Sequence, residues 1–257
     1  MGDRPVGDRT VLVTGGATGI GRAISLLLAR RGQRVVALGR HEEALAALAD
    51  EAAAEGLTVR GLRCDVTSED EVGTTMAELG RVDVLVNNAG IAETAPLPRV
   101  ELADWEHHLR VNATAALLTI RAVLPGMRER DWGRIVAVAS TAAKVGTPYT
   151  ASYTASKHAL LGLVRAVAAE TAGSGVTSNA VCPTFVRSPM TERSVARIAR
   201  RTGRTPADAE AALAGAAPLG RLVEPDEVAE AVGYLVSEAA GCVTGQTLVL
   251  DGGGIQT

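Results

Sequence analysis

Short apolar runs alternate with segments of helical length along the chain, and this alternation limits the possible folds more than any other feature. The runs lie at residues 11–13, 35–38, 57–63, 82–86, 134–139, 176–182 and 247–250. Runs that are apolar throughout are typical of strands buried on both faces of a parallel sheet. The intervening apolar spacing predicts helices at 19–31, 41–55, 68–79, 102–128, 151–171 and 225–237. We therefore predict an α/β fold: a single-domain, doubly wound (Rossmann-type) parallel sheet with helices on both faces.

Two segments fall outside this alternation. Residues 1–8 are polar and are expected to form a flexible tail. Residues 188–220 form the longest excursion between strands, with helical patterns at 191–201 and 206–214. Open α/β sheets bind ligands beyond the carboxyl ends of their strands, so we expect this excursion to be a small helical substrate lid. No linker interrupts the chain, and residues 1–257 are predicted to form one domain.

Composition excludes several other classes of protein. With 26 basic and 29 acidic residues the net charge is -3, so no long basic surface is expected to bind nucleic acid. Aromatic residues make up 2% of the chain, too few to stack single-stranded bases. No stretch reaches the roughly 18 apolar residues of a membrane-spanning helix, and the first residues lack the pattern of a secretory signal. We expect a cytoplasmic protein that binds neither nucleic acid nor membrane.

Cysteine and histidine give no sign of a metal site. The cysteines form no CxxC pair, and we expect buried, reduced thiols at Cys64, Cys182 and Cys242. No second cluster of metal ligands accompanies the histidines of the helical segments. We therefore interpret as helix-surface residues His107, His108 and His158.

A glycine-rich turn follows the first apolar run. Its sequence, TGGATGIG at residues 14–21, leads into an apolar-periodic helix. The free N–H groups and the dipole of a helix N-terminus attract an anion. Gly15 permits a tight turn, Gly19 a close approach of a pyrophosphate, and Gly21 close packing of helix on strand. Because the spacing is GxxxGxG rather than GxGxxG, an ordinary strand-to-helix turn is the alternative. We assign to a dinucleotide site Gly15, Thr18, Gly19, Ile20 and Gly21.

The end of the second run bears on the choice of cofactor. An acidic residue there would bind a ribose 2′-hydroxyl and repel a 2′-phosphate. The run instead ends Leu38-Gly39-Arg40, and a guanidinium suits a phosphate. We predict that NADP(H) is preferred and that NAD(H) is possible. The alternative is that Arg40 only extends into solvent.

Tyr153 and Lys157 open a predicted helix at positions i and i+4, so the phenol and the ammonium share one helix face. A phenol of pKa about 10 exchanges protons poorly at neutral pH. A cation about 4 Å away contributes roughly 4 kcal/mol at an effective dielectric constant of 20, enough to lower that pKa by about three units. Lysine occurs among the 26 basic residues only at Lys144 and Lys157. Taken alone, the pair would be a chance feature of an amphipathic helix.

The motifs taken together resemble the short-chain dehydrogenase/reductase family. They are TGGATGIG at 14–21, Asn87-Asn88-Ala89-Gly90, Asn112, Ser140, and YTASK at 153–157, in the family's order and spacing. The resemblance extends from Thr10 to Gly253. Within the family the chain is most similar to 3-oxoacyl thioester (acyl-carrier-protein) reductases and polyketide ketoreductases.

The resemblance implies four catalytic roles. Tyr153 would be the general acid in reduction and the base in oxidation. Lys157 would lower the pKa of Tyr153 and hold the nicotinamide ribose. Ser140 would hydrogen-bond the substrate carbonyl and stabilise its developing negative charge. Asn112 would position a water leading from Lys157 to solvent.

The resemblance also implies further cofactor contacts. The adenine would lie beside Asp65 and Val66, the adenosine along Asn88, Ala89 and Gly90, and the nicotinamide beside Pro183, Val186 and Ser188. The chain departs from the family where Thr184 replaces a glycine and Ser188 replaces a threonine. The residues alone also allow other interpretations. Asp65 would then be a cap of a helix or turn, and Asn87 and Asn88 would form a turn at the end of a strand.

Four arginines of the expected lid bear on the substrate. If one helix persists that far, they share a face: Arg193, Arg197, Arg200 and Arg204. Such a stripe would meet the phosphates of coenzyme A or the acidic surface of an acyl carrier protein. The alternatives are a solvated helix face and a helix that Gly203 ends before Arg204.

The sequence thus predicts an NADPH-dependent ketoreductase that transfers hydride to a ketone, a 3-oxoacyl thioester or a polyketide-like substrate. The alternative is an NAD-linked secondary-alcohol or 3-hydroxyacyl-CoA dehydrogenase. Residues 91–94 (IAET) stand where related polyketide enzymes carry Pro-Gly-Gly, which weakens the assignment of a polyketide substrate. A non-catalytic scaffold would be expected to lose Tyr153 or Lys157. The resemblance implies a homotetramer through the predicted helices 102–128 and 151–171.

Overall fold

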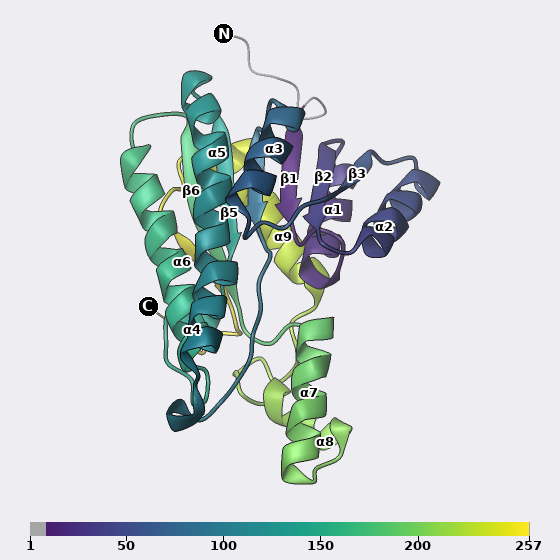
Figure 1. Cartoon of the computed structure of the whole chain (residues 1–257), viewed down its shortest axis with the longest axis vertical. Helices are drawn as coiled ribbons and strands as arrows, with labels where there is room; N and C mark the ends of the chain where they lie inside the picture. The colour runs from purple at the N-terminus through teal and green to yellow at the C-terminus, as the bar shows by residue number, and fades with distance from the viewer. Residues whose placement is uncertain (1–8, 257) are drawn as a thin grey trace.

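The seven predicted strands form one parallel sheet within residues 9–256, which the computed structural model describes (Figure 1). In chain order they are β1 (Thr10–Thr14), β2 (Arg34–Gly39), β3 (Val59–Arg63), β4 (Val84–Asn87), β5 (Gly133–Val138), β6 (Val176–Pro183) and β7 (Thr247–Leu250). Their order across the sheet is β3-β2-β1-β4-β5-β6-β7, so the winding reverses between β1 and β4. This confirms the doubly wound fold. The predicted tail at 1–8 lies outside the described residues.

Helices cover both faces of the sheet. One face carries α1 (Gly19–Arg30), α2 (Glu42–Ala54) and α9 (Pro225–Leu235), and the other α3 (Glu69–Leu79), α5 (Ala115–Glu129) and α6 (Ala151–Glu170). Successive side chains of a strand point to opposite faces. Val11 and Val13 accordingly pack with α1 and α9, whereas Leu12 packs with α3 and α5. This explains why the central part of β1 is apolar at successive positions.

The predicted helix at 102–128 is two helices separated by a π-helical turn. α4 (Leu102–Leu109) ends where the turn Arg110–Thr114 begins, and α5 follows. The N–H of Ala115 bonds to the oxygen of Arg110, five residues back, instead of the usual four. Such turns often mark functional sites. The apolar pattern gave no sign of this interruption, because it stays close to helical spacing on either side.

The segment 188–220 folds as two helices that project beyond the carboxyl edge of the sheet (Figure 1). α7 (Pro189–Thr202) begins at Ser188, whose hydroxyl accepts a hydrogen bond from the N–H of Thr191. It ends at Gly203, which has the left-handed backbone (φ 71°) of a helix C-terminus. α8 is Pro206–Ala214. Arg204 therefore lies outside the helix, as expected from the alternative in which Gly203 ends the helix before it.

Two expectations about burial are wrong. Cys64 and Cys182 are buried, but Cys242 is exposed, because it lies in the loop before β7 rather than in a strand or helix. His108 is buried, not on the surface. Its Nε2 accepts a hydrogen bond from the N–H of Glu93 (3.1 Å) and its Nδ1 donates to the main-chain oxygen of Asp104 (2.7 Å). Both ring nitrogens are thus satisfied without water.

No helix among the described residues has the length and apolar character needed to cross a membrane.

Candidate active site

The glycine-rich turn joins β1 to α1 at the point where the winding reverses. Gly15 has a left-handed backbone (φ 61°), which few other residues adopt without strain. A Cβ on Gly21 would lie 2.1 Å from the oxygen of Gly15, so no side chain fits there. Gly21 therefore lets α1 start against the turn itself, rather than against the strand as predicted. Thr18 is the N-cap of α1 and Ile20 lies in its first turn.

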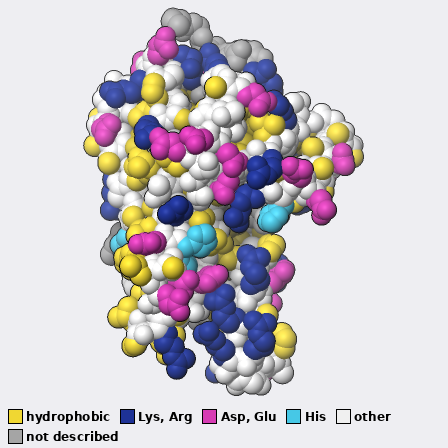
Figure 2. All heavy atoms as spheres, in the orientation of Figure 1, with side chains coloured by type: hydrophobic (Ala, Val, Ile, Leu, Met, Phe, Trp, Pro, Cys, Tyr) yellow, Lys and Arg dark blue, Asp and Glu magenta, His cyan; other side chains and the backbone are white. Residues whose placement is uncertain are grey.

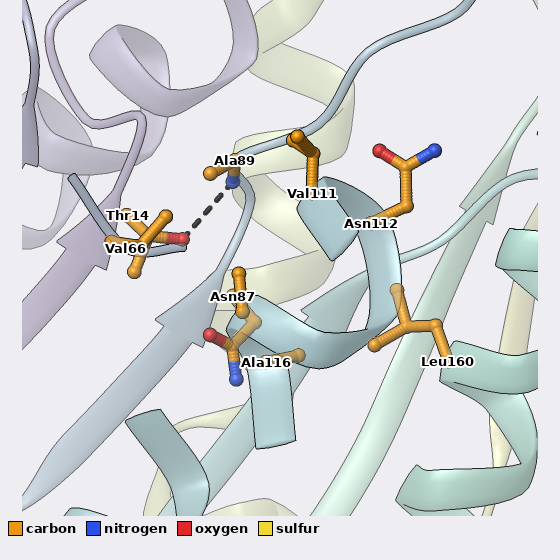
Figure 3. Close-up of a pocket in the computed structure, with 9 residues that line it drawn as sticks. Thr14, Val66, Asn87, Ala89, Val111, Asn112, Ala116 and Leu160 are labelled. Atoms are coloured by element: carbon orange, nitrogen blue, oxygen red, sulfur yellow. Dashed lines mark hydrogen bonds between the residues drawn. The ribbon is translucent and has the colours of Figure 1, made fainter. Parts of the chain in front are cut away.

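The end of β4 is tied to this turn. Thr14 Oγ1 accepts hydrogen bonds from the N–H groups of Asn88 and Ala89, each at 3.0 Å (Figure 3). The Asn88 amide donates to the oxygens of Thr14 (3.0 Å) and Gly15 (3.1 Å). Asn88 thus fixes the shape of the turn. This role is close to the alternative given for it above, a turn at the end of a strand. The role of Thr14 was not predicted, although a polar residue directly after an apolar strand could have indicated it.

Arg40 and Asp65 lie at the carboxyl ends of β2 and β3. Asp65 Oδ1 accepts hydrogen bonds from the N–H (3.0 Å) and hydroxyl (2.8 Å) of Thr67, so it does cap a turn. Burial acts to raise the pKa of Asp65, but these hydrogen bonds and the charges of Arg40 and Arg63 outweigh it and hold the pKa below its ordinary value. Arg40 is exposed, and within residues 9–256 it forms no ion pair. Its guanidinium is available to a ligand.

Ser140, Tyr153 and Lys157 come together where β5 ends beside α6. Ser140 follows β5 and accepts a hydrogen bond from the N–H of Ala142 (3.1 Å). Tyr153 and Lys157 lie one turn apart on α6, with the Lys157 Nζ 5.8 Å from the centre of the Tyr153 ring. Lys157 is buried and donates a hydrogen bond to the oxygen of Val138 (3.0 Å). A hydroxyl, a phenol and an ammonium therefore share one site.

The protonation of this group differs from the prediction. Burial raises the pKa of the Tyr153 phenol, although the Ser140 hydroxyl opposes the shift. Burial also lowers the pKa of Lys157 to about 8. The expected lowering of the phenol pKa by Lys157 is wrong for this arrangement. The ammonium is turned to Val138, and a charge taken out of water is itself destabilised.

Asn112 lies in the π turn and joins three parts of the site. Its Oδ1 accepts from the N–H of Ile91 (2.8 Å), and its Nδ2 donates to the oxygen of Ile91 (3.0 Å) and to Ser156 Oγ (2.9 Å). Ser156 Oγ in turn donates to the oxygen of Tyr153 (2.8 Å). A Cβ on Gly90 would lie 3.1 Å from Asn112 Oδ1 and 3.4 Å from Lys157 Nζ. Ser156 was missed, because its link to the site is Asn112, which is remote in sequence.

A cavity of about 10 Å³ lies between this group and the glycine-rich turn (Figure 3). Its volume matches about one water molecule. The buried Asn87 lines it, and its Nδ2 has no hydrogen-bond partner among the described residues. The remaining lining residues include two predicted cofactor contacts, Val66 and Ala89.

The segment after β6 connects the sheet to the lid. β6 ends at Pro183, and Thr184 donates its N–H to the oxygen of Leu250 (3.1 Å). Among residues 9–256, Thr184 is not one of the non-glycine residues with positive φ, so it replaces a family glycine without strain. Val186 is buried. The first residues of α7 face the glycine-rich turn: a Cβ on Gly19 would lie 3.6 Å from the Cβ of Ser188.

A larger pocket, about 260 Å³, opens between α7, α4 and the start of α6. Its lining residues are Glu93, Thr94, Ala95, Val100, Asp104, His108, Tyr149, Ala151, Ser152, Arg197 and Arg201. Of the predicted arginine stripe, only Arg197 lines the pocket. Arg201, Tyr149 and His108 were missed; the spacing of 197 and 201 at i and i+4 would have been the signal for Arg201. Among the described residues no group of three or more potential metal ligands occurs.

Known proteins resemble this chain over nearly their full length. Residues 9–199 match the family described as short chain dehydrogenase. D-beta-hydroxybutyrate dehydrogenase of Cupriavidus necator is 36% identical, covering 95% of this chain and 97% of that protein. The 3-oxoacyl-[acyl-carrier-protein] reductase of Thermotoga maritima is 36% identical, with the same coverage of 95% and 97%. An actinorhodin polyketide ketoreductase variant, crystallised with NADPH, superposes with a TM-score of 0.91 at 36% identity over 98% of both chains. The chain therefore belongs to the short-chain dehydrogenase/reductase family, oxidoreductases that interconvert C=O and CH–OH groups and bind NAD(P).

Proposed function

We propose that this protein is an NADPH-dependent ketoreductase that acts on a 3-oxoacyl thioester or a related ketone. The observation that carries the proposal is the grouping of Ser140, Tyr153 and Lys157 at the end of β5. At the end of β2, the exposed Arg40 forms no ion pair within residues 9–256 and adds support for NADPH. Two of the reported relatives support it, since one reduces 3-oxoacyl groups and the other is a ketoreductase crystallised with NADPH.

The residues around the glycine-rich turn fit a dinucleotide. The contact of Gly21 with Gly15 leaves no side chain over the N-terminus of α1, where free N–H groups suit a pyrophosphate. Arg40 suits a 2′-phosphate on the adenosine ribose, and Asp65 and Val66 would flank the adenine. Pro183, Val186 and Ser188 would lie along the nicotinamide. The bound reduced cofactor would supply the hydride.

The protein would supply the proton. In reduction, Ser140 donates a hydrogen bond to the substrate carbonyl, and Tyr153 gives its phenolic proton to the oxygen as the carbon receives hydride, so that C=O becomes CH–OH. A raised pKa keeps Tyr153 protonated at neutral pH, and an alkoxide is a stronger base than a phenolate. Lys157, with a pKa of about 8, is suited to return a proton to the phenolate.

Asn112 would support this proton return. Its side-chain amide is committed to Ile91 and Ser156. A water between Lys157 and solvent would therefore have to be held by the main chain of the π turn rather than by the amide. The segment 188–220 would act as the substrate lid over the pocket next to Tyr153.

One comparison tests the proposal. Reduction of acetoacetyl-CoA with NADPH should have a higher kcat/KM than the same reduction with NADH, and higher than oxidation of 3-hydroxybutyrate with NAD⁺. A preference for NAD⁺ and the alcohol would favour the alternative, an NAD-linked secondary-alcohol or 3-hydroxyacyl dehydrogenase, which the D-beta-hydroxybutyrate dehydrogenase relative supports.

We also propose a homotetramer. α5 and α6 would form the subunit contacts, and Leu117 on α5 is 44% exposed in the single chain, as expected for a side chain that a partner covers. Sedimentation equilibrium should give four times the chain mass of 26.4 kDa. A stable monomer at micromolar concentration would exclude this assembly.

A further inference from the structure

The pocket beside Ser152 has two walls that differ in charge. Arg197 and Arg201 lie one turn apart on the face of α7 that lines the pocket. Basic side chains gather over this part of the lid (Figure 2). Glu93 and Asp104 line the pocket from outside the lid, on the loop after β4 and on α4.

The protein does not neutralise the two guanidinium groups. Within residues 9–256, neither Arg197 nor Arg201 has a carboxylate within 4.0 Å, although Glu93 and Asp104 line the same pocket. The one hydrogen bond of Arg197 to a described residue is a long one, from Nη1 to Thr94 Oγ1 (3.4 Å). Arg187, just before the lid, differs: it pairs with both Glu210 (3.0 Å) and Glu224 (3.1 Å). The pocket therefore offers two cationic donors that no described carboxylate pairs with.

Such a pair suits an oxyanion. A guanidinium presents its N–H groups in a planar fork that matches the oxygens of a carboxylate or phosphate. Arg197 is partly buried, so water competes less for its charge than at an open surface. The pocket volume of about 260 Å³ is below the roughly 300–1,000 Å³ of sites for drug-sized ligands. A short substrate fits it better than a polycyclic one.

We infer that Arg197 and Arg201 form a specificity site for an anionic group on the substrate. The inference rests on the proposed ketoreductase function and narrows its substrate class to a ketone that carries an oxyanion. That group is either the carboxylate of a free oxo acid or the phosphate of a pantetheine arm. Ser152, which directly precedes Tyr153 on α6, lines the same pocket, so the pocket borders the helix that carries the proposed proton donor.

Four ketones that share one acetoacetyl unit test this inference. Acetoacetate carries a carboxylate, acetoacetyl-CoA carries phosphates, and ethyl acetoacetate and acetoacetyl-N-acetylcysteamine are neutral. The kinetics of the unmodified protein, R197Q and R201Q are measured with NADPH. The matched control is R200Q, which removes an exposed arginine of the same helix outside the pocket. Thermal unfolding of each variant reports whether it is folded.

We expect R197Q and R201Q to raise the KM of the anionic ketone by roughly tenfold to a hundredfold, with kcat little changed, because one charged hydrogen bond is lost. The neutral ketones and R200Q should show no such change. A KM effect confined to acetoacetate identifies the carboxylate as the anion, and one confined to acetoacetyl-CoA identifies the phosphate. Equal effects on neutral and anionic ketones, or no effect on any, would overturn the inference.

Binding without turnover separates this inference from the proposed function. Calorimetry measures the binding of acetoacetate and of 4′-phosphopantetheine to the intact protein and to R197Q and R201Q. In one outcome the unmodified protein reduces none of the four ketones and still binds the anions, while R197Q and R201Q lose that binding. This result would support the anion site and contradict the proposed ketoreductase function. Normal ketone reduction with no binding difference between the variants and R200Q would reject the anion site alone.

Discussion

Lys157 donates a hydrogen bond to the main-chain oxygen of Val138, 3.0 Å away, at the end of β5. The ammonium is thereby held at the last residue of β5, and it lies 5.8 Å from the centre of the Tyr153 ring. Its burial lowers its pKa to about 8 and that of Tyr153 rises. The Tyr153 phenol therefore holds its proton more tightly than a free tyrosine does. The Lys157 ammonium gives up a proton more readily than a free lysine does. Lys157 can therefore return a proton to the phenolate at moderate cost.

Tyr153→Phe should remove the proton donor and leave the cofactor site intact. We expect kcat to fall by at least about a hundredfold, the lower range for loss of a general acid, with the Kd for NADPH changed less than about threefold. Stopped-flow reduction and fluorescence titration of NADPH measure the two quantities. Tyr234→Phe, at an exposed position of α9, is the control and should retain full activity. Turnover that survives in the Tyr153 variant would contradict the assigned acid.

Arg40→Asp should reverse the preference between the cofactors. The new carboxylate repels a 2′-phosphate and accepts hydrogen bonds from ribose hydroxyls. The KM for NADPH should rise by more than about tenfold, because one charged hydrogen bond is lost, while the KM for NADH stays level or falls. Arg200→Asp makes the same charge change on the lid and should leave both constants unchanged. If both cofactors respond equally to Arg40→Asp, the guanidinium does not contact the 2′-phosphate.

The burial of Lys157 predicts a specific pH dependence of stability. Its pKa is about 8 in the folded protein, against 10.5 for a lysine exposed to water. Below pH 8 the folded state bears the full cost of a buried charge, and this cost disappears as the pH rises from 8 toward 10.5, because the unfolded chain then holds more protons than the folded one.

Lys157→Met removes this titration. The free energy of unfolding of the variant, minus that of the unmodified protein, should decrease by roughly 2–3 kcal/mol between pH 7 and pH 10. The lost hydrogen bond to Val138 lowers the difference by a constant amount at every pH. Urea unfolding at intervals across this range gives the values. A difference that does not vary with pH would mean that the lysine is not buried as a charge.

Gly21→Ala tests the fit between the turn and α1. The added Cβ would meet the Gly15 oxygen at 2.1 Å, so the turn must move. We expect a loss of roughly 1–3 kcal/mol of stability, as for overpacking in a core, and a large rise in the Kd for NADPH. Gly73→Ala on α3, where a Cβ meets nothing within 4 Å, should instead stabilise the helix by up to about 1 kcal/mol. Unaltered cofactor binding in the Gly21 variant would show that the turn is not the phosphate site.

Much of the fold could be predicted because its strands are buried on both faces. Val11, Leu12 and Val13 contact two different cores, so these three central positions of β1 had to be apolar. The motifs likewise give the positions of Ser140, Tyr153 and Lys157, since each lies at the end of a strand or the start of a helix. These features are local and leave a direct trace in the sequence.

The rest depends on contacts between distant residues. The buried His108 accepts its hydrogen bond at Nε2 from the main chain of Glu93, 15 residues away in sequence. Ser156 joins the site through the amide of Asn112, which lies in the π turn, 44 residues away. The lid arginines showed the same limit: one helix face carries several, but only the packing of α7 against the loop after β4 selects Arg197 and Arg201. The direction of the Tyr153 pKa shift was wrong for this reason too, because the orientation of Lys157 is set by Val138.

The π turn at Arg110–Thr114 holds one residue more than the α-helix it interrupts. One residue corresponds to about 100° of rotation around the helix axis. α4 and α5 can therefore present their faces independently: α4 directs His108 to the pocket beside Ser152, while α5 keeps its apolar stripe on the sheet. Deleting a single residue here would restore a regular helix and force one of those two surfaces out of alignment.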